Sequence, residues 1–304
     1  MTSPLRGIVP PLITPLSGRD TLDVPGLERL IEHLIEGRVA GIFALGTTGE
    51  APSLSHRLRR ELVQHTLRCV AGRVPVLVGI TDTSLDESVR LAREVADMGA
   101  DGLVTSAPFY FPAGPPELRE YLEDLLSEVP LPVMLYNMPS LTKTSFHRDV
   151  VVWAMDQEKV SGIKDSSGDL IYFKKLLHLA LSQRPDWPLL VGPEEILAEA
   201  VLAGGHGGVS GGANLHPQLY VELYESAVAG DLQKTRILSD EVLSLSHAIY
   251  SVGKHGSSTI KGLKCSLSLL GICDDFMAAP FHRFRDEERA VISDHLHSLG
   301  LQPS

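Results

Sequence analysis

The sequence predicts an α/β fold in which eight parallel strands form a (β/α)8 TIM barrel that a C-terminal helical extension follows. Three observations lead to this prediction. Short apolar, β-branched runs recur about eight times, amphipathic stretches of helical spacing separate them, and only helical patterns follow the eighth run. Strands that alternate with helices in this way run parallel, and eight such units close a barrel.

The apolar runs are short, which is typical of strands buried on both faces. We predict strands over residues 7–14, 41–44, 76–80, 102–105, 133–136, 160–164, 189–192 and 207–210. We predict helices between them over residues 24–36, 55–69, 84–98, 116–128, 145–155, 169–181 and 195–203.

The remaining part of the chain is helical in pattern. A closing helix over residues 217–229 ends at Gly230, a residue that often terminates helices. Further helices are expected over 232–250, near 259–270 and over 287–299, with no flexible linker before them. We therefore predict a barrel over residues 1–230 and a helical region over residues 231–304 that packs on it.

Composition excludes several classes of protein. A formal charge of −11 argues against nucleic acid or an anionic membrane as the main partner. The chain has no apolar run long enough to span a membrane and does not start with a secretory signal. Its cysteines, Cys69, Cys265 and Cys273, are odd in number and scattered, so neither a disulfide framework nor a zinc site is indicated. We expect a cytoplasmic protein.

Lys164 lies where the sixth predicted strand ends and its loop begins, in Gly162-Ile163-Lys164-Asp165. The carboxyl ends of barrel strands meet at one mouth. Desolvation there lowers the pKa of an amine, and a neutral amine can attack a ketone to form a Schiff base. An isolated lysine is more often a surface residue, so the prediction depends on the other strand ends.

Hydroxyl groups follow two of those strands. Thr47 and Thr48 stand between glycines in the turn after the second strand, where their hydroxyls and the backbone N–H groups can hold a small carboxylate. The same residues are also compatible with a plain tight turn. Tyr136 ends the fifth strand, where it can relay protons or simply pack.

The seventh and eighth strands end in acidic and glycine-rich stretches. Gly192-Pro193-Glu194-Glu195 can bind substrate hydroxyls, or Glu194 and Glu195 can merely begin the next helix. The glycines of residues 207–212 let the backbone approach the mouth, and no arginine or lysine nearby supports a phosphate site. Metal-ligand spacing is missing at the strand ends, so a protonated imine would act as the electron sink.

The loop after the fourth strand carries the aromatic run Pro108-Phe109-Tyr110-Phe111-Pro112. Aromatic side chains at a loop tip are typical of subunit contacts. We therefore expect this loop to contact another copy of the chain.

Three of these stretches, in order and at these intervals, resemble the dihydrodipicolinate synthase/N-acetylneuraminate lyase family. They are Gly46-Thr47-Thr48-Gly49-Glu50, Leu135-Tyr136-Asn137-Met138-Pro139 and Gly162-Ile163-Lys164, and the likeness covers nearly the whole chain. The resemblance implies a barrel with C-terminal helices, usually a homotetramer, that acts on pyruvate or releases it without a cofactor or metal.

The resemblance also implies a role for each matching residue. Lys164 would form the Schiff base and Tyr136 would donate and accept the proton. Thr48 would hold the pyruvate carboxylate, Thr47 would link Tyr136 to Tyr110 of a neighbouring subunit, and the backbone of Val209 would line the pyruvate site. Gly192, Glu194, Glu195 and Gly211 are further candidates for substrate binding.

Two positions depart from the family pattern. Leu141 stands where dihydrodipicolinate synthases ordinarily carry an arginine for the carboxylate of aspartate semialdehyde, and Lys143 two residues on is no assured substitute. Gly211 matches a serine of the sialic acid lyases. We therefore expect a class I aldolase or lyase that cleaves a 2-oxo acid, such as a 2-keto-3-deoxy sugar acid or an N-acetylneuraminate-like substrate.

Other interpretations remain open. The chain can be a dihydrodipicolinate synthase that has replaced its arginine, or a dehydratase of a keto-deoxy sugar acid, which uses the same lysine. It can also be a sensor that binds a keto acid without turnover.

Overall fold

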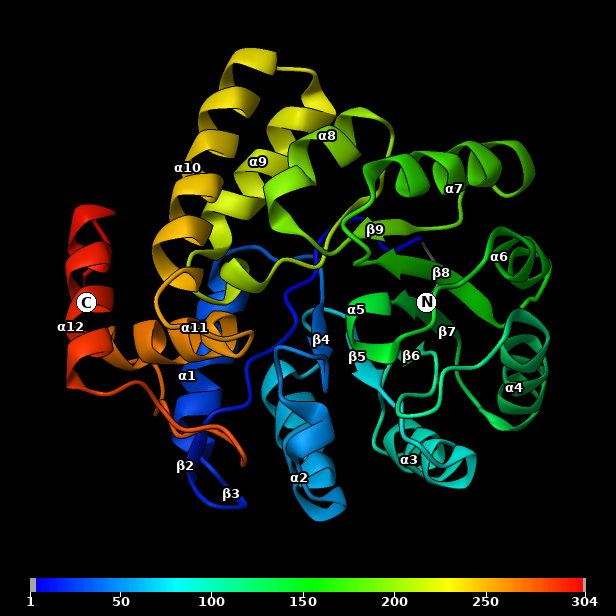
Figure 1. The fold of residues 1–304 in the computed structure, drawn as a ribbon, viewed down its shortest axis with the longest axis horizontal. Coiled ribbons are helices and arrows are strands. Elements are labelled where there is room, and N and C mark those ends of the chain that lie inside the picture. The colour runs from blue at the N-terminus through cyan, green and yellow to red at the C-terminus, as the bar shows by residue number, and fades with distance from the viewer. Residues whose placement is uncertain (1–3, 303–304) are drawn as a thin grey trace.

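Eight parallel strands form the centre of the computed structural model, which describes residues 4–302 (Figure 1). They are β1 (Gly7–Ile8), β4 (Ile42–Ala44), β5 (Val76–Gly79), β6 (Gly102–Ser106), β7 (Val133–Asn137), β8 (Val160–Asp165), β9 (Leu189–Val191) and β10 (Gly207–Gly208). Each strand from β4 to β10 pairs with the next, and β10 pairs with β1. A parallel bridge between Pro11 and Phe43 joins the two ends of the sheet, so the predicted TIM barrel is confirmed.

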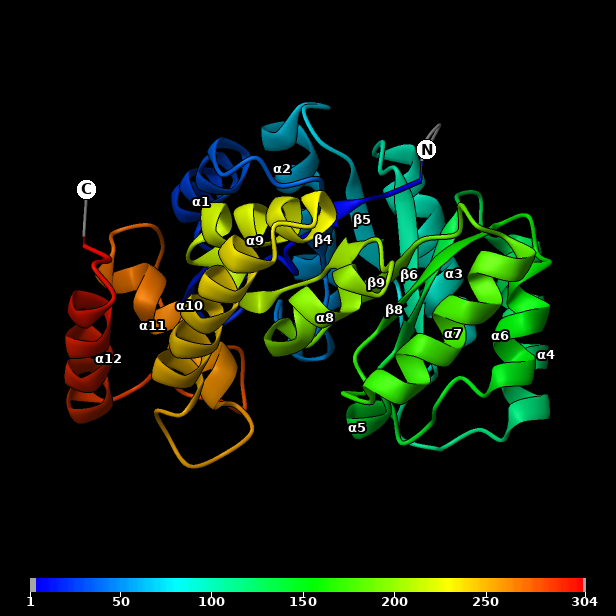
Figure 2. The same cartoon turned by 90° about the horizontal axis from the view of Figure 1, so that it is seen from above.

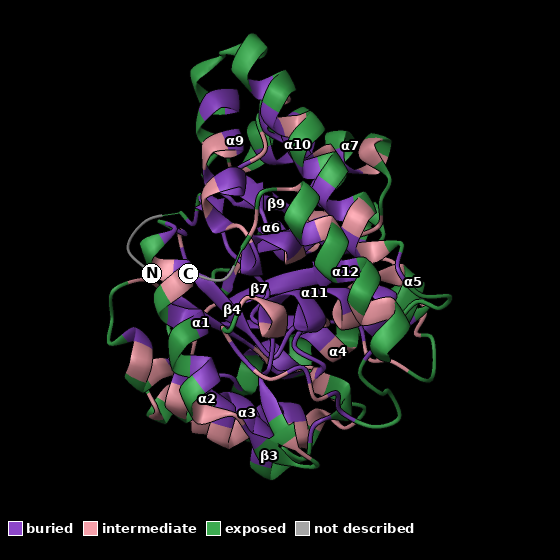
Figure 3. Cartoon of the chain, turned by 90° about the vertical axis from the view of Figure 1, so that its left-hand side faces the viewer, coloured by how far each residue is buried: buried purple, intermediate pink, exposed green. Residues whose placement is uncertain are grey.

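Successive side chains of each strand enter two different apolar clusters. Ile42 and Ala44 pack in the cluster that contains the helices, whereas Phe43 between them packs with Leu77, Val104 and other strand residues. Because strand side chains alternate between the two faces, the second cluster fills the barrel interior. Figure 3 shows the buried strands at the centre and exposed residues on the outer faces of the helices.

The barrel helices follow the predicted order. They are α1 (Val24–Glu36), α2 (His56–Val70), α3 (Leu85–Asp97), α4 (Pro115–Glu128), α6 (Arg148–Met155), α7 (Leu170–Gln183), α8 (Leu197–Leu202) and α9 (Pro217–Ala229). Asp23, Ser55 and Asp169 cap three of these helices by accepting hydrogen bonds from first-turn N–H groups. These caps start each helix close to the loop that leaves the preceding strand.

Three helices complete the chain: α10 (Leu232–Tyr250), α11 (Ser258–Leu269) and α12 (Asp286–Ser298). They stand together on one side of the barrel, where α10 packs against α9 (Figure 1). Figure 2 shows the loop between α10 and α11 at the same end of the molecule as α5 (Pro139–Thr142). The division into residues 1–230 and 231–304 stays a prediction. Within residues 4–302, every helix is too short or too polar to cross a membrane.

Several elements differ from the predictions. The first strand is limited to Gly7–Ile8 instead of residues 7–14, because Pro10 and Pro11 have no N–H for the ladder. The hairpin of β2 (Leu16–Gly18) and β3 (Thr21–Leu22) and the short helix α5 were not predicted. The helix expected over 195–203 consists of the 3₁₀ turn η2 (Glu194–Ile196) followed by α8. Two further 3₁₀ turns, η1 (Ala51–Ser53) and η3 (Gly211–Asn214), lie in loops.

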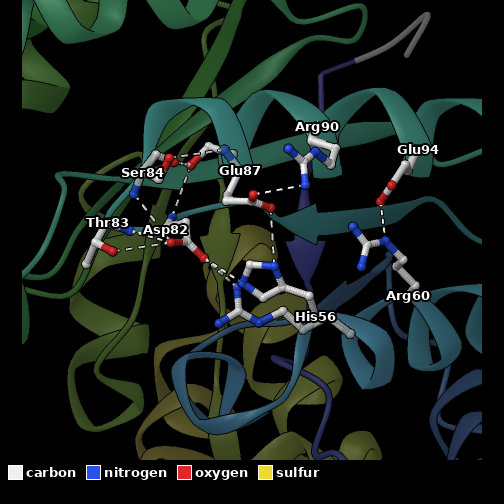
Figure 4. A network of polar contacts seen from close by, with 10 residues as sticks. His56, Arg60, Asp82, Thr83, Ser84, Glu87, Arg90 and Glu94 are labelled. Carbon is white, nitrogen blue, oxygen red and sulfur yellow. Dashed lines mark hydrogen bonds and ion pairs between the residues drawn. The ribbon is translucent and has the colours of Figure 1, made fainter.

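A polar network ties α2 to α3 and to the loop after β5 (Figure 4). The imidazole of His56 lies between Asp82 and Glu87, at 3.4 and 3.2 Å from their carboxylate oxygens. The guanidinium of Arg59 lies 2.9 Å from Asp82, and both of these side chains are largely buried. Exposed ion pairs contribute little, so within this network the Arg59–Asp82 pair is the more stabilising ion pair. The Asp82 carboxylate also accepts hydrogen bonds from the N–H groups of Thr83 and Ser84 in the loop.

Candidate active site

A cavity of about 830 Å³ opens at the carboxyl ends of the strands, a volume typical of small-molecule sites. Loops after β4, β9 and β10, the ends of β7 and β8, and the segment between α10 and α11 line it. Nine of the predicted site residues lie in its wall: Thr47, Thr48, Tyr136, Lys164, Gly192, Glu194, Glu195, Val209 and Gly211. The fold therefore gathers residues that the sequence places on five different loops and strands.

Lys164 is directly opposite Tyr136 in the parallel pairing of β7 and β8. Its amine lies 4.0 Å from the centre of the Tyr136 ring and 5.3 Å from that of Phe43, and the residue is only 4% exposed. Burial lowers the pKa of this amine, although the Tyr136 hydroxyl partly opposes the shift. A larger fraction of neutral, nucleophilic amine at neutral pH is the chemical consequence.

The Tyr136 hydroxyl is held by Thr47, whose Oγ1 lies 3.1 Å from the phenolic oxygen. Thr47 and Thr48 belong to a loop that is closely packed on its neighbours. A Cβ at Gly49 would lie 2.8 Å from the carbonyl oxygen of Leu12, so only glycine fits there, and Thr14 donates a 2.7 Å hydrogen bond to the Gly49 carbonyl. The loop is therefore a tight turn that contacts with Leu12 and Thr14 hold in place.

Glu50 anchors the same loop to the C-terminal helices. Its carboxylate forms a buried ion pair with Lys264 of α11 and accepts a 2.8 Å hydrogen bond from the N–H of Ala278. Lys264 also donates to the carbonyl of Phe276. Sequence reasoning missed this contact, since nothing local marks Lys264 within an otherwise ordinary helix.

Asp165 follows Lys164 and joins the ends of β7 and β8. Its carboxylate accepts hydrogen bonds from the Asn137 amide at 2.8 Å and the Ser167 hydroxyl at 2.9 Å. Burial raises the pKa of Asp165 against the effect of these donors. Asp165 directly follows Lys164, and Asn137 directly follows Tyr136, so their places beside predicted site residues could have marked both in the sequence.

Glu194 lines the cavity and is enclosed by donors. Its Oε1 accepts hydrogen bonds from the hydroxyls of Tyr220 and Tyr250, at 2.6 and 2.9 Å, and its Oε2 accepts one from the N–H of Gly212 at 2.8 Å. Burial raises the pKa of this carboxyl to about 7. Glu195 is exposed and accepts a 3.1 Å hydrogen bond from Ser246. Both residues also begin η2, so the two sequence interpretations are compatible.

Tyr110 does not reach the cavity of its own chain. It is 81% exposed, with a positive φ of 86°, and its ring stands edge-on to Phe111 at 5.0 Å. A second cavity of about 220 Å³ lies beside Thr47 and Tyr136, with Phe43 and Phe109 in its wall.

Leu141 of α5 lies in the wall of both cavities and is 53% exposed. Lys143 donates to the carbonyl of Ser140 and belongs to neither wall. His206 lies just before β10, where its Nδ1 accepts a hydrogen bond from the Leu189 N–H, so it is a structural residue at the opposite end of the strands. Within the described part of the chain, no cluster of three or more His, Cys, Asp or Glu residues is placed to hold a metal ion.

Comparison with known proteins gives the family. The model of the dihydrodipicolinate synthetase family matches residues 4–299. The chain belongs to this family. Its members are lyases and aldolases, so the chain is an enzyme of that kind.

Relatives of the family carry two kinds of name. A probable 2-dehydro-3-deoxy-D-pentonate aldolase of Escherichia coli K12 is 31% identical over 98% of each chain. A dihydrodipicolinate synthase structure from Bacteroides thetaiotaomicron is 53% identical and covers 98% of this chain and 100% of its own, with a TM-score of 0.95. The E. coli K12 prophage protein YagE, solved in complex with pyruvate, is 29% identical over 97% and 99% of the two chains, with a TM-score of 0.91.

Proposed function

We propose that this family member is a pyruvate-dependent class I aldolase that reversibly cleaves a 2-oxo acid, with a 2-keto-3-deoxy sugar acid as its substrate. The observation that carries the proposal is the position of the Lys164 amine. It is buried in the cavity wall, 4.0 Å from the Tyr136 ring, and the Tyr136 hydroxyl is itself held by Thr47. Burial supplies the neutral amine that imine formation needs.

In this mechanism the Lys164 amine attacks C2 of the 2-oxo acid, and Tyr136 delivers the proton with which the C2 oxygen leaves as water. Tyr136, now a phenolate, takes the proton of the C4 hydroxyl, and the C3–C4 bond breaks as its electron pair moves to the protonated imine nitrogen. The aldehyde departs, and Tyr136 returns the proton to C3 of the remaining enamine. Water hydrolyses the resulting imine, which releases pyruvate and restores Lys164. The imine itself accepts the electrons, so no cofactor is needed.

Other residues of the cavity wall would bind the pyruvate part of the substrate. Thr48 and the backbone amides of its loop hold the carboxylate, and the backbone at Gly192 and Val209 shapes the wall around pyruvate. Thr47 passes the proton between Tyr136 and solvent. Tyr110 of a neighbouring subunit extends this relay by entering the cavity beside Thr47, in a homotetramer that its exposed aromatic loop helps to form.

The substrate class rests on the charges in the cavity wall. Among its described residues, Lys164 is the sole lysine or arginine, and Leu141 occupies the α5 side. A leucine cannot pair with the carboxylate of aspartate semialdehyde, whereas Glu195 can accept hydrogen bonds from hydroxyl groups. The name of the E. coli relative, a 2-dehydro-3-deoxy-D-pentonate aldolase, agrees with this choice. The three unpaired cysteines fit a reducing, cytoplasmic location.

The rival functions are a dihydrodipicolinate synthase, which the B. thetaiotaomicron structure's name favours, a sugar-acid dehydratase and a keto-acid sensor. Incubation with pyruvate, borohydride reduction and mass spectrometry should show one adduct, on Lys164, and the folded Lys164→Met variant should show none. A panel of sugar acids and aspartate semialdehyde then separates the enzymes by product. An unlabelled lysine in folded protein would refute the Schiff-base mechanism.

A further inference from the structure

Gly211 leaves room for a phenolic hydroxyl at the cavity wall. A Cβ placed at this position would lie 3.2 Å from the hydroxyl oxygen of Tyr250 and 3.8 Å from Oε2 of Glu194. Both Gly211 and Tyr250 belong to the wall of the large cavity. The hydroxyl of Tyr250, at the end of α10, therefore stands where a longer residue at 211 would project.

The hydrogen bonds of Glu194 determine which way that hydroxyl points. Above its pKa of about 7 the Glu194 carboxylate is ionised and can only accept, so there Tyr220 and Tyr250 both direct their protons at its Oε1. That oxygen then has both lone pairs engaged, and Oε2 accepts from the N–H of Gly212. Glu194 consequently acts mainly on these three donors, with little capacity left for a substrate hydroxyl.

The two tyrosines differ in what else they face. Tyr220 is fully buried and is not part of the cavity wall, whereas Tyr250 lines the cavity. Because the proton of Tyr250 is committed to Glu194, its oxygen keeps lone pairs that can accept a hydrogen bond from a ligand. Ser257 and Thr259, at the start of α11, add hydroxyls to the cavity wall.

We propose that Tyr250 is a specificity-determining residue, whose hydroxyl oxygen accepts a hydrogen bond from a hydroxyl group of the substrate beyond the bond that is cleaved. This inference rests on the aldolase function proposed above. It assigns to Tyr250 a recognition role that sequence reasoning placed on Glu194, and it makes Glu194 a positioning residue.

The test compares two variants that each remove one hydroxyl from the same carboxylate. Condensation of pyruvate is measured with glyceraldehyde and with propionaldehyde at a pH above 7, where Glu194 is ionised. The ratio of the two kcat/KM values reports recognition of the aldehyde's hydroxyls. In Tyr250→Phe this ratio should fall by about 3- to 10-fold, the range of one neutral hydrogen bond. The loss should appear mainly in the KM for glyceraldehyde. In Tyr220→Phe the ratio should stay at the wild-type value, even where Tm falls.

An unchanged ratio in Tyr250→Phe, or an equal fall in both variants, would overturn the inference. If Tyr250→Phe does not fold, Gly211→Ala serves instead, because its methyl group would lie 3.2 Å from the Tyr250 hydroxyl oxygen and press on it. A fall of the ratio in the same direction is then expected. Borohydride trapping with pyruvate is run on every variant. A wild-type protein without the Lys164 adduct would refute the aldolase itself, whereas an intact adduct with an unchanged ratio refutes only the role of Tyr250.

Discussion

Lys264 and Glu50 form a buried ion pair that connects α11 to the loop carrying Thr47 and Thr48. Both side chains are almost inaccessible to solvent, at 0 and 1% exposure. The same carboxylate accepts the Ala278 N–H, and the same amine donates to the Phe276 carbonyl. The C-terminal helices therefore help to hold the loop that carries Thr47 and Thr48, as well as packing on the barrel.

Breaking this pair on one side should be strongly destabilising. We expect Lys264→Met to lower the free energy of unfolding by about 3–5 kcal/mol, because it leaves the Glu50 carboxylate buried and unpaired. The double variant Glu50→Gln/Lys264→Met should recover a large part of that loss, since no charge remains buried. Urea unfolding of wild type, Lys264→Met, Glu50→Gln and the double variant measures both effects. A double variant as unstable as the sum of the single variants would show that the pairing itself is unimportant.

The stability gap between wild type and Lys164→Met should depend on pH. The folded protein lowers the pKa of Lys164, so between that lowered value and about 10.4 the unfolded chain binds the proton that the folded chain has released. Wild-type stability relative to Lys164→Met should therefore rise as pH increases through this window. Urea unfolding of both proteins from pH 7 to 10 measures the gap. A gap that is constant over that range would contradict the lowered pKa.

Glu194 should make wild-type stability fall, instead of rise, with increasing pH, and at lower pH than Lys164 does. Its pKa is raised from 4.5 to about 7 by burial, so the folded protein keeps a proton that the unfolded chain releases near pH 4.5. Wild-type stability relative to Glu194→Gln should accordingly fall by up to about 3 kcal/mol between pH 4.5 and 7. Urea unfolding of wild type and Glu194→Gln across this pH range measures the difference in their free energies of unfolding. If wild type gained stability relative to Glu194→Gln as pH rose, the raised pKa of Glu194 would be refuted.

Introducing an arginine at position 141 should shift substrate preference. We expect wild-type protein to condense pyruvate with aspartate semialdehyde poorly, and Leu141→Arg to raise the kcat/KM for that aldehyde by roughly tenfold through a charge-assisted hydrogen bond. Leu141→Met, which introduces a long side chain without a charge, is the control. If the wild type already uses the semialdehyde as well as a sugar-derived aldehyde, the argument from Leu141 fails.

Tyr110 should act on the site of another subunit. We expect Tyr110→Phe and Lys164→Met each to be nearly inactive alone, because one lacks the relay hydroxyl and the other the nucleophile. Co-expressed as mixed oligomers, they should regain activity at sites where Lys164 of one chain meets Tyr110 of the other. Activity of purified mixed oligomers gives the result, with sedimentation confirming assembly. Mixed oligomers as inactive as their parents would place Tyr110 outside the relay.

The sequence alone was sufficient to predict the barrel and the main cavity residues. Apolar runs alternating with helical patterns are local signals, and in a parallel barrel every strand end faces the same mouth, so Thr47, Tyr136 and Lys164 could be grouped without a structure. The register of β7 on β8, which sets Tyr136 opposite Lys164, agrees with that grouping.

Only the tertiary structure showed the contacts between distant segments. Lys264 stands 214 positions after its partner Glu50, and Tyr250 reaches Glu194 and the space beside Gly211 from the end of a helix in another part of the chain. Such contacts depend on how α10 and α11 pack on the barrel, and packing of this kind leaves no periodic pattern in the residues that make it. The residues at the strand ends can therefore be identified from local sequence signals, whereas the contacts that hold them and complete the cavity wall depend on the folded chain.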